Sequence, residues 1–237
     1  MSDQVLVEAK GLTKYYGSFC ALSNVDLTLK KGKIIGILGP NGSGKTTFIK
    51  MLAGLLNVSS GTLTIDGHTP GIVTKGMVSY LPERPYFAAW MRVDQCLDYF
   101  ADFYTDFDRA LAEQMLSDLG VSTAATLRTL SKGTKEKVQL VLVMARRAKL
   151  YLLDEPIAGV DPAAREYILR TIVRAYHPEA TVLISTHLIA DVEPVLDECI
   201  LIHGGKILMH GEPRVIHEQY GMDLDRYFRE VFKCIEN

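Results

Sequence analysis

The sequence feature that most constrains the fold of this chain is a glycine-rich segment, residues 39–47, which stands between two apolar segments. Residues 34–38 before it have the composition of a buried strand, and residues 48–56 after it carry apolar side chains at helical spacing. A glycine-rich turn at a helix N-terminus directs several backbone N–H groups toward one point, where the helix dipole also favours negative charge. The segment therefore predicts a polyphosphate site at the start of a helix.

The same segment matches the pattern G-x-x-x-x-G-K-[ST] of phosphate-binding loops. In that pattern the lysine, here Lys45, reaches the β- and γ-phosphates, and the hydroxyl of the next residue, Thr46, joins the shell of a Mg²⁺ ion. The glycines let the backbone approach phosphate without an intervening Cβ atom. The residues of this loop that we predict to bind the nucleotide are Gly39, Pro40, Asn41, Gly42, Ser43, Gly44, Lys45, Thr46 and Thr47.

Composition and charge narrow the class of protein. The 237 residues are 48% hydrophobic, which suffices for one large domain with a substantial core. The net charge of −2 gives no electrostatic reason to expect a nucleic-acid partner. The four cysteines lack metal-ligand spacing, so we expect no structural zinc site. No apolar run reaches the ~18 residues that a membrane helix needs, and no secretory signal is present, so we expect a cytoplasmic chain.

Hydrophobic periodicity predicts strands on both sides of the glycine-rich segment. Residues 5–9 and 25–29 alternate apolar and polar side chains, which is typical of half-buried antiparallel strands. Short apolar runs predict further strands at 62–65, 78–81, 150–153, 181–184 and 199–202, and a helix over 162–175. We expect the strands at 62–65 and 78–81 to extend the nucleotide-binding core. The alternation of strands and helices indicates a mainly parallel sheet with flanking helices.

Residues 90–147 change to a helical period and predict an all-helical insert, with one face formed by Leu111, Met115 and Leu119. Nine of the twenty aromatic residues lie within 80–107. Two interpretations of this concentration stay open, because aromatic residues fill cores and also anchor interfaces. They form either the core of a subdomain or a docking surface that includes Tyr86, Phe87 and Trp90. From residue 223 onward, helical spacing predicts an amphipathic helix that packs back onto the domain.

A second candidate site follows the predicted strand at 150–153, where Asp154 and Glu155 precede Pro156. Open parallel sheets bind ligands at the carboxyl ends of their strands. One of the two acids can serve a metal ion and the next can serve a water molecule. Because adjacent strand residues point to opposite sides, they share a site only where the chain turns, which Pro156 favours.

In combination, these segments resemble the ATP-binding subunit of an ABC transporter over nearly the whole chain. The matching motifs are the Walker A loop at 39–47, the signature Leu130-Ser131-Lys132-Gly133-Thr134, Walker B at Asp154 and Glu155, the D-loop Gly159-Val160-Asp161 and the switch histidine in Ser185-Thr186-His187. Tyr16 stands where the family has the aromatic residue that stacks on adenine, with Tyr15 as the alternative one position away.

The resemblance implies an α/β fold, with a P-loop NTPase core, an antiparallel β subdomain and an inserted α-helical subdomain. It implies one ABC ATPase domain, 1–237, that comprises a core of 1–85 and 148–220, a helical subdomain of 86–147 and a C-terminal helix of 221–237. ATP and Mg²⁺ are the implied cofactors. The implied partners are a transmembrane permease and a second ATP-binding subunit, identical or different, with the chain peripheral on the inner face of the cell membrane.

The resemblance also assigns roles to individual residues. Each ATP lies between the Walker A loop of one subunit and the signature of its partner, represented here by Ser131 and Gly133, and Asp161 couples the two sites. Two ATP molecules then close a head-to-tail dimer. The implied catalytic residues are Glu155, which polarises water, His187, which contacts the γ-phosphate and orients that water, and Lys45. The implied metal ligands are Thr46, Asp154 and Glu83.

Two motifs depart from the family pattern. Glu83, in Tyr80-Leu81-Pro82-Glu83, stands where the family usually has a metal-sensing glutamine; its charge is one that Arg84 could compensate. Without a gap, Lys132 replaces the first signature glycine and Thr134 the glutamine, and Ser131 and Gly133 are kept. With a gap, Lys132, Thr134 and Lys135 replace Gly, Gly and Gln.

The LSKG-type signature and the Pro-Glu loop are similar to bacterial ABC-2 exporters, so we expect export of an unidentified substrate. Two alternatives stay open: a non-transport ABC ATPase acting on DNA or ribosomes, and an ATP-dependent dimerisation switch. The chain lacks the long coiled-coil insertion typical of the first, and its intact Glu155 and His187 disfavour the second. A GTPase is disfavoured because no N-K-x-D motif is present.

Overall fold

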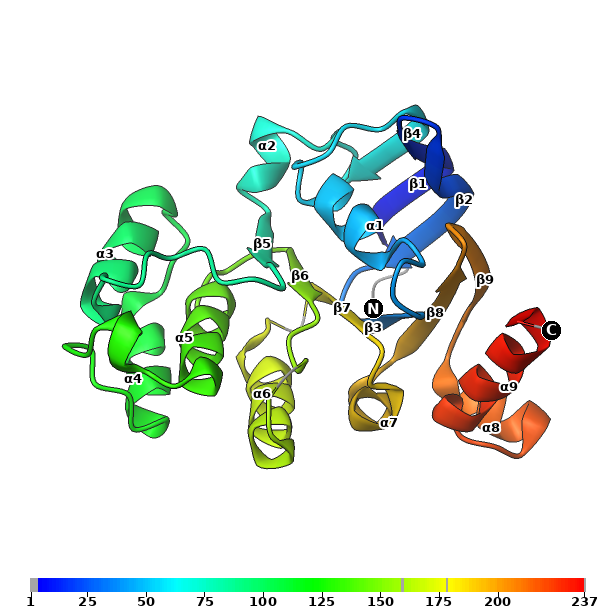
Figure 1. Cartoon of the computed structure of the whole chain (residues 1–237). Coiled ribbons are helices and arrows are strands. Elements are labelled where there is room, and N and C mark those ends of the chain that lie inside the picture. Colours follow the sequence, from blue (N-terminus) through cyan, green and yellow to red (C-terminus); the bar gives the residue numbers. More distant parts are fainter. Residues whose placement is uncertain (1–3, 159, 178, 237) are drawn as a thin grey trace.

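The structure is a computed structural model that describes residues 4–158, 160–177 and 179–236. Its centre is a six-stranded sheet with the strand order β5-β6-β7-β3-β8-β9, in which only β9 runs antiparallel to its neighbour (Figure 1). The strands of this sheet are β3 (Ile34–Leu38), β5 (Val78–Leu81), β6 (Leu150–Asp154), β7 (Thr181–Thr186), β8 (Glu198–His203) and β9 (Lys206–Gly211). The predicted mainly parallel sheet is therefore confirmed.

This strand order brings distant segments of the chain together. Strand β7 lies between β3 and β6, so the carboxyl ends of these three strands are neighbours at one edge of the sheet. Every residue of β3, β6 and β7 is buried, as is typical of parallel strands that are covered on both faces. The glycine-rich loop, the acidic pair and the segment 185–187 consequently emerge side by side.

A second, three-stranded antiparallel sheet has the order β2-β1-β4. Its strands are β1 (Val5–Tyr16), β2 (Phe19–Lys30) and β4 (Ser60–Ile65), so the predicted strands at 5–9 and 25–29 are confirmed and are longer than expected. The strand predicted at 62–65 is present as part of β4, which belongs to the antiparallel sheet and not to the six-stranded sheet. It pairs with β1, with Val7 opposite Ile65, because its alternating side chains suit an antiparallel layer with one buried face.

Helices cover both faces of the six-stranded sheet. On one face α1 (Lys45–Leu52) and the antiparallel sheet share a hydrophobic core that includes Ile37, Phe48 and Leu152. On the other face a second core includes Leu38 and Leu153, the neighbours of Ile37 and Leu152 along their strands. Helices α6 (Pro162–Ala175) and α7 (Ile189–Val192) lie on this second face, followed by the short helix η2 (Glu193–Val195), and α2 (Ile72–Lys75) precedes β5. The helix predicted at 162–175 is confirmed.

The helical insert stands beside the sheet, on the left of Figure 1. It contains α3 (Val93–Phe103), α4 (Arg109–Asp118), η1 (Leu127–Thr129) and α5 (Lys132–Met144). The predicted face of α4 is wrong in one position, since Leu111 is 38% exposed. Ala112, Met115 and Leu116 form the buried face instead, one position further along the helix.

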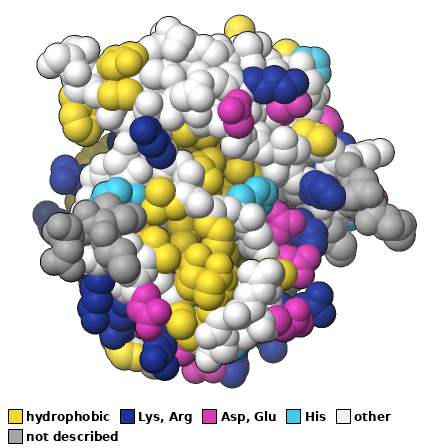
Figure 2. All heavy atoms as spheres, turned by 90° about the vertical axis from the view of Figure 1, so that its right-hand side faces the viewer, with side chains coloured by type: hydrophobic (Ala, Val, Ile, Leu, Met, Phe, Trp, Pro, Cys, Tyr) yellow, Lys and Arg dark blue, Asp and Glu magenta, His cyan; other side chains and the backbone are white. Residues whose placement is uncertain are grey.

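Two helices follow β9, namely α8 (Pro213–Tyr220) and α9 (Leu224–Glu236), and α9 confirms the predicted C-terminal amphipathic helix. The backbone N–H of Leu224 donates a hydrogen bond to Glu193, and Phe232 contacts the ring of His203. Figure 2 shows the side on which β9, α8 and α9 lie, where hydrophobic side chains gather in a central hollow and charged side chains surround it. Among the described helices, none combines the length and the apolar character needed to cross a bilayer.

Candidate active site

The glycine-rich loop connects β3 to α1, as the sequence predicts. Gly44 precedes the first residue of α1 with φ of 113°, which side chains rarely adopt. A Cβ atom on Gly44 would also lie 2.8 Å from the carbonyl oxygen of Ala21. Both constraints require glycine here, so the backbone turns sharply and the N–H groups at the start of α1 are left open toward the cleft.

Lys45 lies on the concave side of this loop. Its ammonium group donates hydrogen bonds to the carbonyl oxygens of Gly39 (2.7 Å) and Pro40 (3.2 Å), and lies 3.6 Å from Oε1 of Glu155. Burial lowers the pKa of Lys45, and the nearby carboxylate of Glu155 opposes that shift. The loop thus holds one positive charge between its own carbonyl groups and an acidic side chain.

Asp154 links the loop to two neighbouring strands. Its Oδ1 atom accepts hydrogen bonds from the hydroxyl of Thr46 (3.0 Å) and from the hydroxyl of Ser185 (2.7 Å). The side chain is almost fully buried, and this burial raises the pKa of Asp154, although both hydroxyl groups oppose the shift. Thr46 and Asp154, which are 108 positions apart in the chain, are therefore in direct contact.

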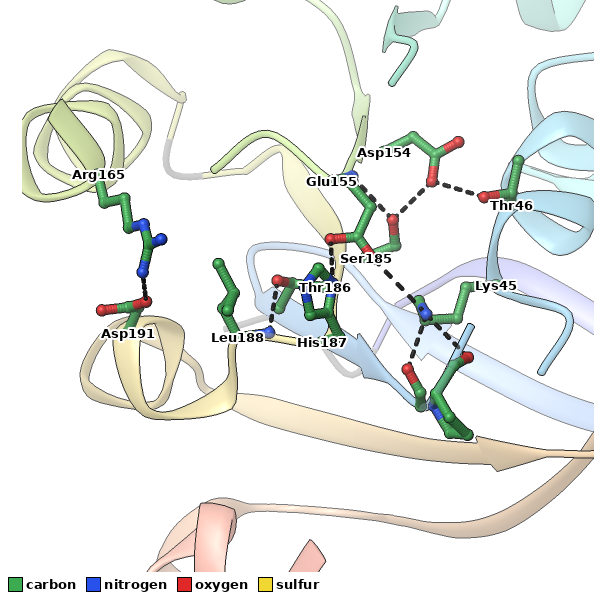
Figure 3. A network of polar contacts seen from close by, with 12 residues as sticks. Lys45, Thr46, Asp154, Glu155, Arg165, Ser185, Thr186, His187, Leu188 and Asp191 are labelled. Atoms are coloured by element: carbon green, nitrogen blue, oxygen red, sulfur yellow. Dashed lines mark hydrogen bonds and ion pairs between the residues drawn. The ribbon is translucent and has the colours of Figure 1, made fainter. Parts of the chain in front are cut away.

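Glu155 turns toward the same site. Its φ of 52° shows that the chain bends there, and such a bend allows two consecutive carboxylates to face one site. The backbone N–H of Glu155 donates to the hydroxyl of Ser185 (3.0 Å), which fixes the bend. His187 completes the arrangement, with its Nδ1 atom 3.0 Å from Oε2 of Glu155 (Figure 3).

These groups border a cleft with a volume of about 460 Å³. The predicted site residues that line it are Tyr16, Asn41, Gly42, Ser43, Gly44, Lys45, Thr46, Thr47, Glu83, Glu155 and His187. Tyr15 does not line it, which favours Tyr16 of the two aromatic candidates. Phe19, which was not predicted, also lines the cleft and pairs with Tyr16 across the β1–β2 turn. The intervening Gly17-Ser18 is the sequence signal that could have identified Phe19, because a two-residue turn sets its flanking residues opposite each other.

The remaining predicted residues do not line this cleft. Gly39, Pro40 and Asp154 contact the lining residues Lys45 and Thr46. Ser131 lies at the start of α5, where its hydroxyl accepts a hydrogen bond from the N–H of Thr134 (3.1 Å) and caps the helix.

Two more predicted residues lie outside the cleft. Nothing lies within 4 Å of a Cβ atom placed on Gly133, so this part of the helix start faces open space. Asp161 precedes α6 and its carbonyl oxygen accepts a hydrogen bond from Arg165. Gly159 of the predicted D-loop lies outside the described residues.

The donor set of this site suits a hard cation that is shared with phosphate. The Oδ2 atom of Asp154 and the hydroxyl of Ser43 are buried and accept or donate no hydrogen bond within the described residues. In the same part of the chain, no group of three or more His, Cys, Asp or Glu side chains could hold a metal alone. Mg²⁺ in phosphate-binding enzymes is held by one or two carboxylates together with substrate phosphates and water. Thr46 and Asp154 therefore fit a magnesium ion that a nucleotide helps to bind.

Comparison with known proteins agrees with this geometry. The ABC transporter family model matches residues 22–158, and the chain belongs to this family, among its ATP-binding subunits. The ABC-type transporter ATP-binding protein EcsA of Bacillus subtilis (strain 168) is 31% identical over 96% of this chain and 97% of its own length.

Two further comparisons are informative. The linearmycin resistance ATP-binding protein LnrL of the same organism is 27% identical over 92% of this chain and 73% of its own length. A solved ATP-binding subunit of an ABC transporter superposes with a TM-score of 0.85 at 28% identity, covering 96% of this chain and 99% of that one. The predicted α/β P-loop NTPase fold is confirmed by this similarity.

Proposed function

We propose that this chain hydrolyses ATP for a membrane transporter and binds Mg-ATP in the cleft beside its glycine-rich loop. The observation that carries the proposal is a continuous set of hydrogen bonds from Thr46 through Asp154 and Ser185 to Glu155 (Figure 3). These contacts join the helix start that would bind phosphate to the backbone of Glu155, the residue whose carboxylate would activate water. Membership of the ABC transporter family supports the same function.

On the phosphate side, the open N–H groups of the loop and the ammonium of Lys45 would offset the charge of the β- and γ-phosphates. Thr46 and Asp154 would hold Mg²⁺, with Glu83 as a further oxygen ligand from the cleft wall. When bound, this ion neutralises charge on the phosphate oxygens. The Tyr16 and Phe19 rings at the cleft rim would stack on the adenine base.

On the water side, the two oxygens of Glu155 have different neighbours. Oε2 contacts His187 and Oε1 lies near Lys45, so the carboxylate is held in one orientation. Glu155 would accept a hydrogen bond from the attacking water, and His187 would contact the γ-phosphate and orient that water. Loss of either side chain would leave nucleotide binding largely intact and slow hydrolysis.

The second half of the site would come from another subunit. Ser131 and Gly133 lie outside the cleft of their own chain, at the start of α5, where backbone N–H groups and the helix dipole favour a phosphate. A second ATP-binding subunit arranged head to tail would present these residues to the γ-phosphate, and Asp161 would couple the two sites. Two ATP molecules would then close the dimer.

The membrane permease would dock on the helical insert. Tyr86 and Phe87 lie with ring centroids 4.5 Å apart, and Trp90 nearby in the chain is 71% exposed. Phe100 is buried, so the aromatic residues of this region divide between a subdomain core and an exposed surface. Exposed aromatic residues are frequent interface anchors, and this surface would hold the chain against the inner face of the membrane.

We base the proposed direction of transport, export, on the signature motif of this chain and on the name of one relative. The LSKG-type signature favours an exporter, and one relative is named for resistance to linearmycin. Export of a toxic compound or another small molecule through a separate permease is the function that this combination supports best. No nucleic-acid partner is proposed for a chain with a net charge of −2.

An ATPase assay combined with size-exclusion chromatography tests the proposal. We expect the purified chain to hydrolyse ATP, and Glu155→Gln to abolish turnover while an ATP-bound dimer accumulates. Turnover that survives in Glu155→Gln contradicts the role of Glu155. ATP-dependent dimers without turnover in the unchanged protein would instead favour a dimerisation switch. Co-purification of the permease with the unchanged protein, and its loss in Trp90→Glu, tests the docking surface.

A further inference from the structure

Tyr80 is a polar residue near the candidate metal site that the proposed mechanism does not use. It lies on β5, directly opposite Leu152 of the neighbouring strand β6. Asp154 is two residues beyond Leu152, so it projects from the same face of the sheet as Tyr80. The Tyr80 ring packs against the hydrophobic core that contains Phe48 of α1, the helix that also carries Thr46. Tyr80 therefore borders the space between β6 and α1 into which Asp154 points.

Tyr80 and Asp154 each carry a buried polar atom that has no hydrogen-bond partner among the described residues. The phenol oxygen of Tyr80 and the Oδ2 atom of Asp154 are both inaccessible to solvent, and neither makes a hydrogen bond to any described residue. The other oxygen of Asp154, in contrast, accepts two hydrogen bonds. A buried polar atom without a partner is costly and uncommon, and its usual explanation is a bound water, an ion or a functional role.

The electrostatic surroundings keep Tyr80 in its neutral form. Burial is the main effect that raises the pKa of Tyr80, and the carboxylates of Asp154 and Glu83 add to it. A neutral phenol both donates and accepts a hydrogen bond, so it can connect a carboxylate to a water molecule.

We infer that Tyr80 is a positioning residue for the magnesium ion, linked through one ordered water of the metal shell to the free Oδ2 atom of Asp154. This inference rests on the proposed binding of Mg-ATP. Groups that form hydrogen bonds with a metal-ligating side chain fix the orientation of that side chain and contribute to metal affinity. The ring of Tyr80 packs in the core, and a phenylalanine ring would fill the same space. Only the hydroxyl group of Tyr80 is therefore assigned to positioning the metal ion.

Tyr80→Phe tests the inference because it removes only the hydroxyl. Tyr151→Phe is the matched control, since Tyr151 is a buried tyrosine of β6 that faces the opposite core and donates its hydroxyl proton to the carbonyl of Arg146. Both changes are made in the Glu155→Gln background, which prevents turnover. Isothermal titration calorimetry then measures ATP affinity in Mg²⁺ and in EDTA, and the ratio of the two affinities reports the contribution of the metal.

We expect Tyr80→Phe to lower this ratio about tenfold, which is the usual effect on metal affinity when a hydrogen-bond partner of a metal ligand is lost. The affinity for ATP in EDTA should be unchanged. Tyr151→Phe should leave the ratio unchanged. Without nucleotide, the unfolding temperature of Tyr80→Phe should equal or exceed that of the parent, because the hydroxyl that is removed makes no hydrogen bond to a described residue. The unfolding temperature of Tyr151→Phe should be lower than that of the parent, because this variant loses a hydrogen bond.

Three outcomes are decisive against the inference. An unchanged ratio in Tyr80→Phe overturns it, and so does an equal loss of affinity in Mg²⁺ and in EDTA, which would make the hydroxyl a support of the loop. If the parent itself binds ATP no better in Mg²⁺ than in EDTA, the proposed Mg-ATP site fails first, and the inference fails with it.

Discussion

The Nδ1 atom of His187 lies 3.0 Å from the Oε2 atom of Glu155, at the mouth of the candidate active site. The Glu155 side chain is only 9% exposed, whereas that of His187 is 43% exposed. The buried carboxylate is thus held from the cleft side by an imidazole that a ligand can reach. Since His187 immediately follows β7 and Glu155 follows β6, the pairing of these two strands fixes the distance between the two side chains.

Replacement of His187 by alanine should slow ATP hydrolysis about a hundredfold, because Glu155 loses the partner that orients it and the water loses a second contact. ATP affinity should change little, since the loop and Lys45 remain. The matched control is His210→Ala, which removes a histidine that lies 2.9 Å from Glu198 outside the cleft. Steady-state ATPase measurements on both variants give the answer. Equal losses in the two variants would contradict a specific role for His187.

Ser131→Arg should leave ATP binding to the single chain intact and prevent closed dimers. Ser131 does not line the cleft of its own chain, and a bulky cation at the start of α5 would block the partner's nucleotide. The substitution also removes a helix cap worth about 1 kcal/mol. Asp108→Ala is the control, because it removes the equivalent cap from α4. Light scattering with ATP in the Glu155→Gln background distinguishes the two, and a normal dimer in Ser131→Arg would refute the shared site.

Most helices and strands could be predicted from local sequence. The features that could not be predicted all depend on which strands pair with one another or on how distant segments pack. Apolar runs such as 150–153 and 181–184 identified the buried strands, and the glycine-rich segment identified the helix start. The sheet to which β4 belongs could not be identified from the sequence, because a short strand does not specify its partner. The contact between Thr46 and Asp154 depends on the order β6-β7-β3, which periodicity alone does not encode.

The same limit applies to individual side chains. Phe19 was not predicted to line the cleft, because its position there depends on its pairing with Tyr16 across the β1–β2 turn. Leu111 was assigned to a buried face because apolar side chains at a spacing of four residues are compatible with more than one buried face of a helix. Packing against the neighbouring helices determines which face is buried, and the sequence of α4 alone does not show it. The Tyr80 hydroxyl has no hydrogen-bond partner among the described residues, and its relation to Asp154 follows only from the sheet, which sets Tyr80 opposite Leu152, two residues before Asp154.

Glu83→Gln should keep ATP turnover within about tenfold of the unchanged protein. Glu83 lines the cleft, and an amide oxygen at the same place can still bind the metal or its water. The change also removes a negative charge that acts on both Asp154 and Lys45. Glu83→Ala is the comparison, because it removes the oxygen as well as the charge and should slow turnover further. Complete loss of turnover in Glu83→Gln would show that the carboxylate does work that an amide cannot.

Asp66 connects the two sheets through lysines from both. Its carboxylate is bonded to Lys149, which precedes β6, and lies 3.1 Å from Lys31, which follows β2. Hydrogen bonds from Lys149 and Lys31 lower the pKa of Asp66 below its ordinary value of 3.8. An acid with a lowered pKa in the folded state stabilises the protein above its unfolded pKa, and this contribution is lost as the pH falls through the folded value.

Asp66→Asn should therefore lower the unfolding temperature near pH 7 by roughly 0.4–4 °C, as expected for the loss of about 0.2–1 kcal/mol from partly exposed ion pairs. Asparagine also tolerates the φ of 48° at this position, so the backbone is not strained by the change. Thermal unfolding followed by circular dichroism from about pH 7 to about pH 2 should show the two proteins converging below pH 3.8, as Asp66 becomes protonated in the folded protein. The exposed pair of Glu8 and Lys10 supplies the control, and Glu8→Gln should shift the unfolding temperature less at every pH. A difference between Asp66→Asn and the parent that persists unchanged in acid would mean that Asp66 acts through its turn geometry and not through its charge.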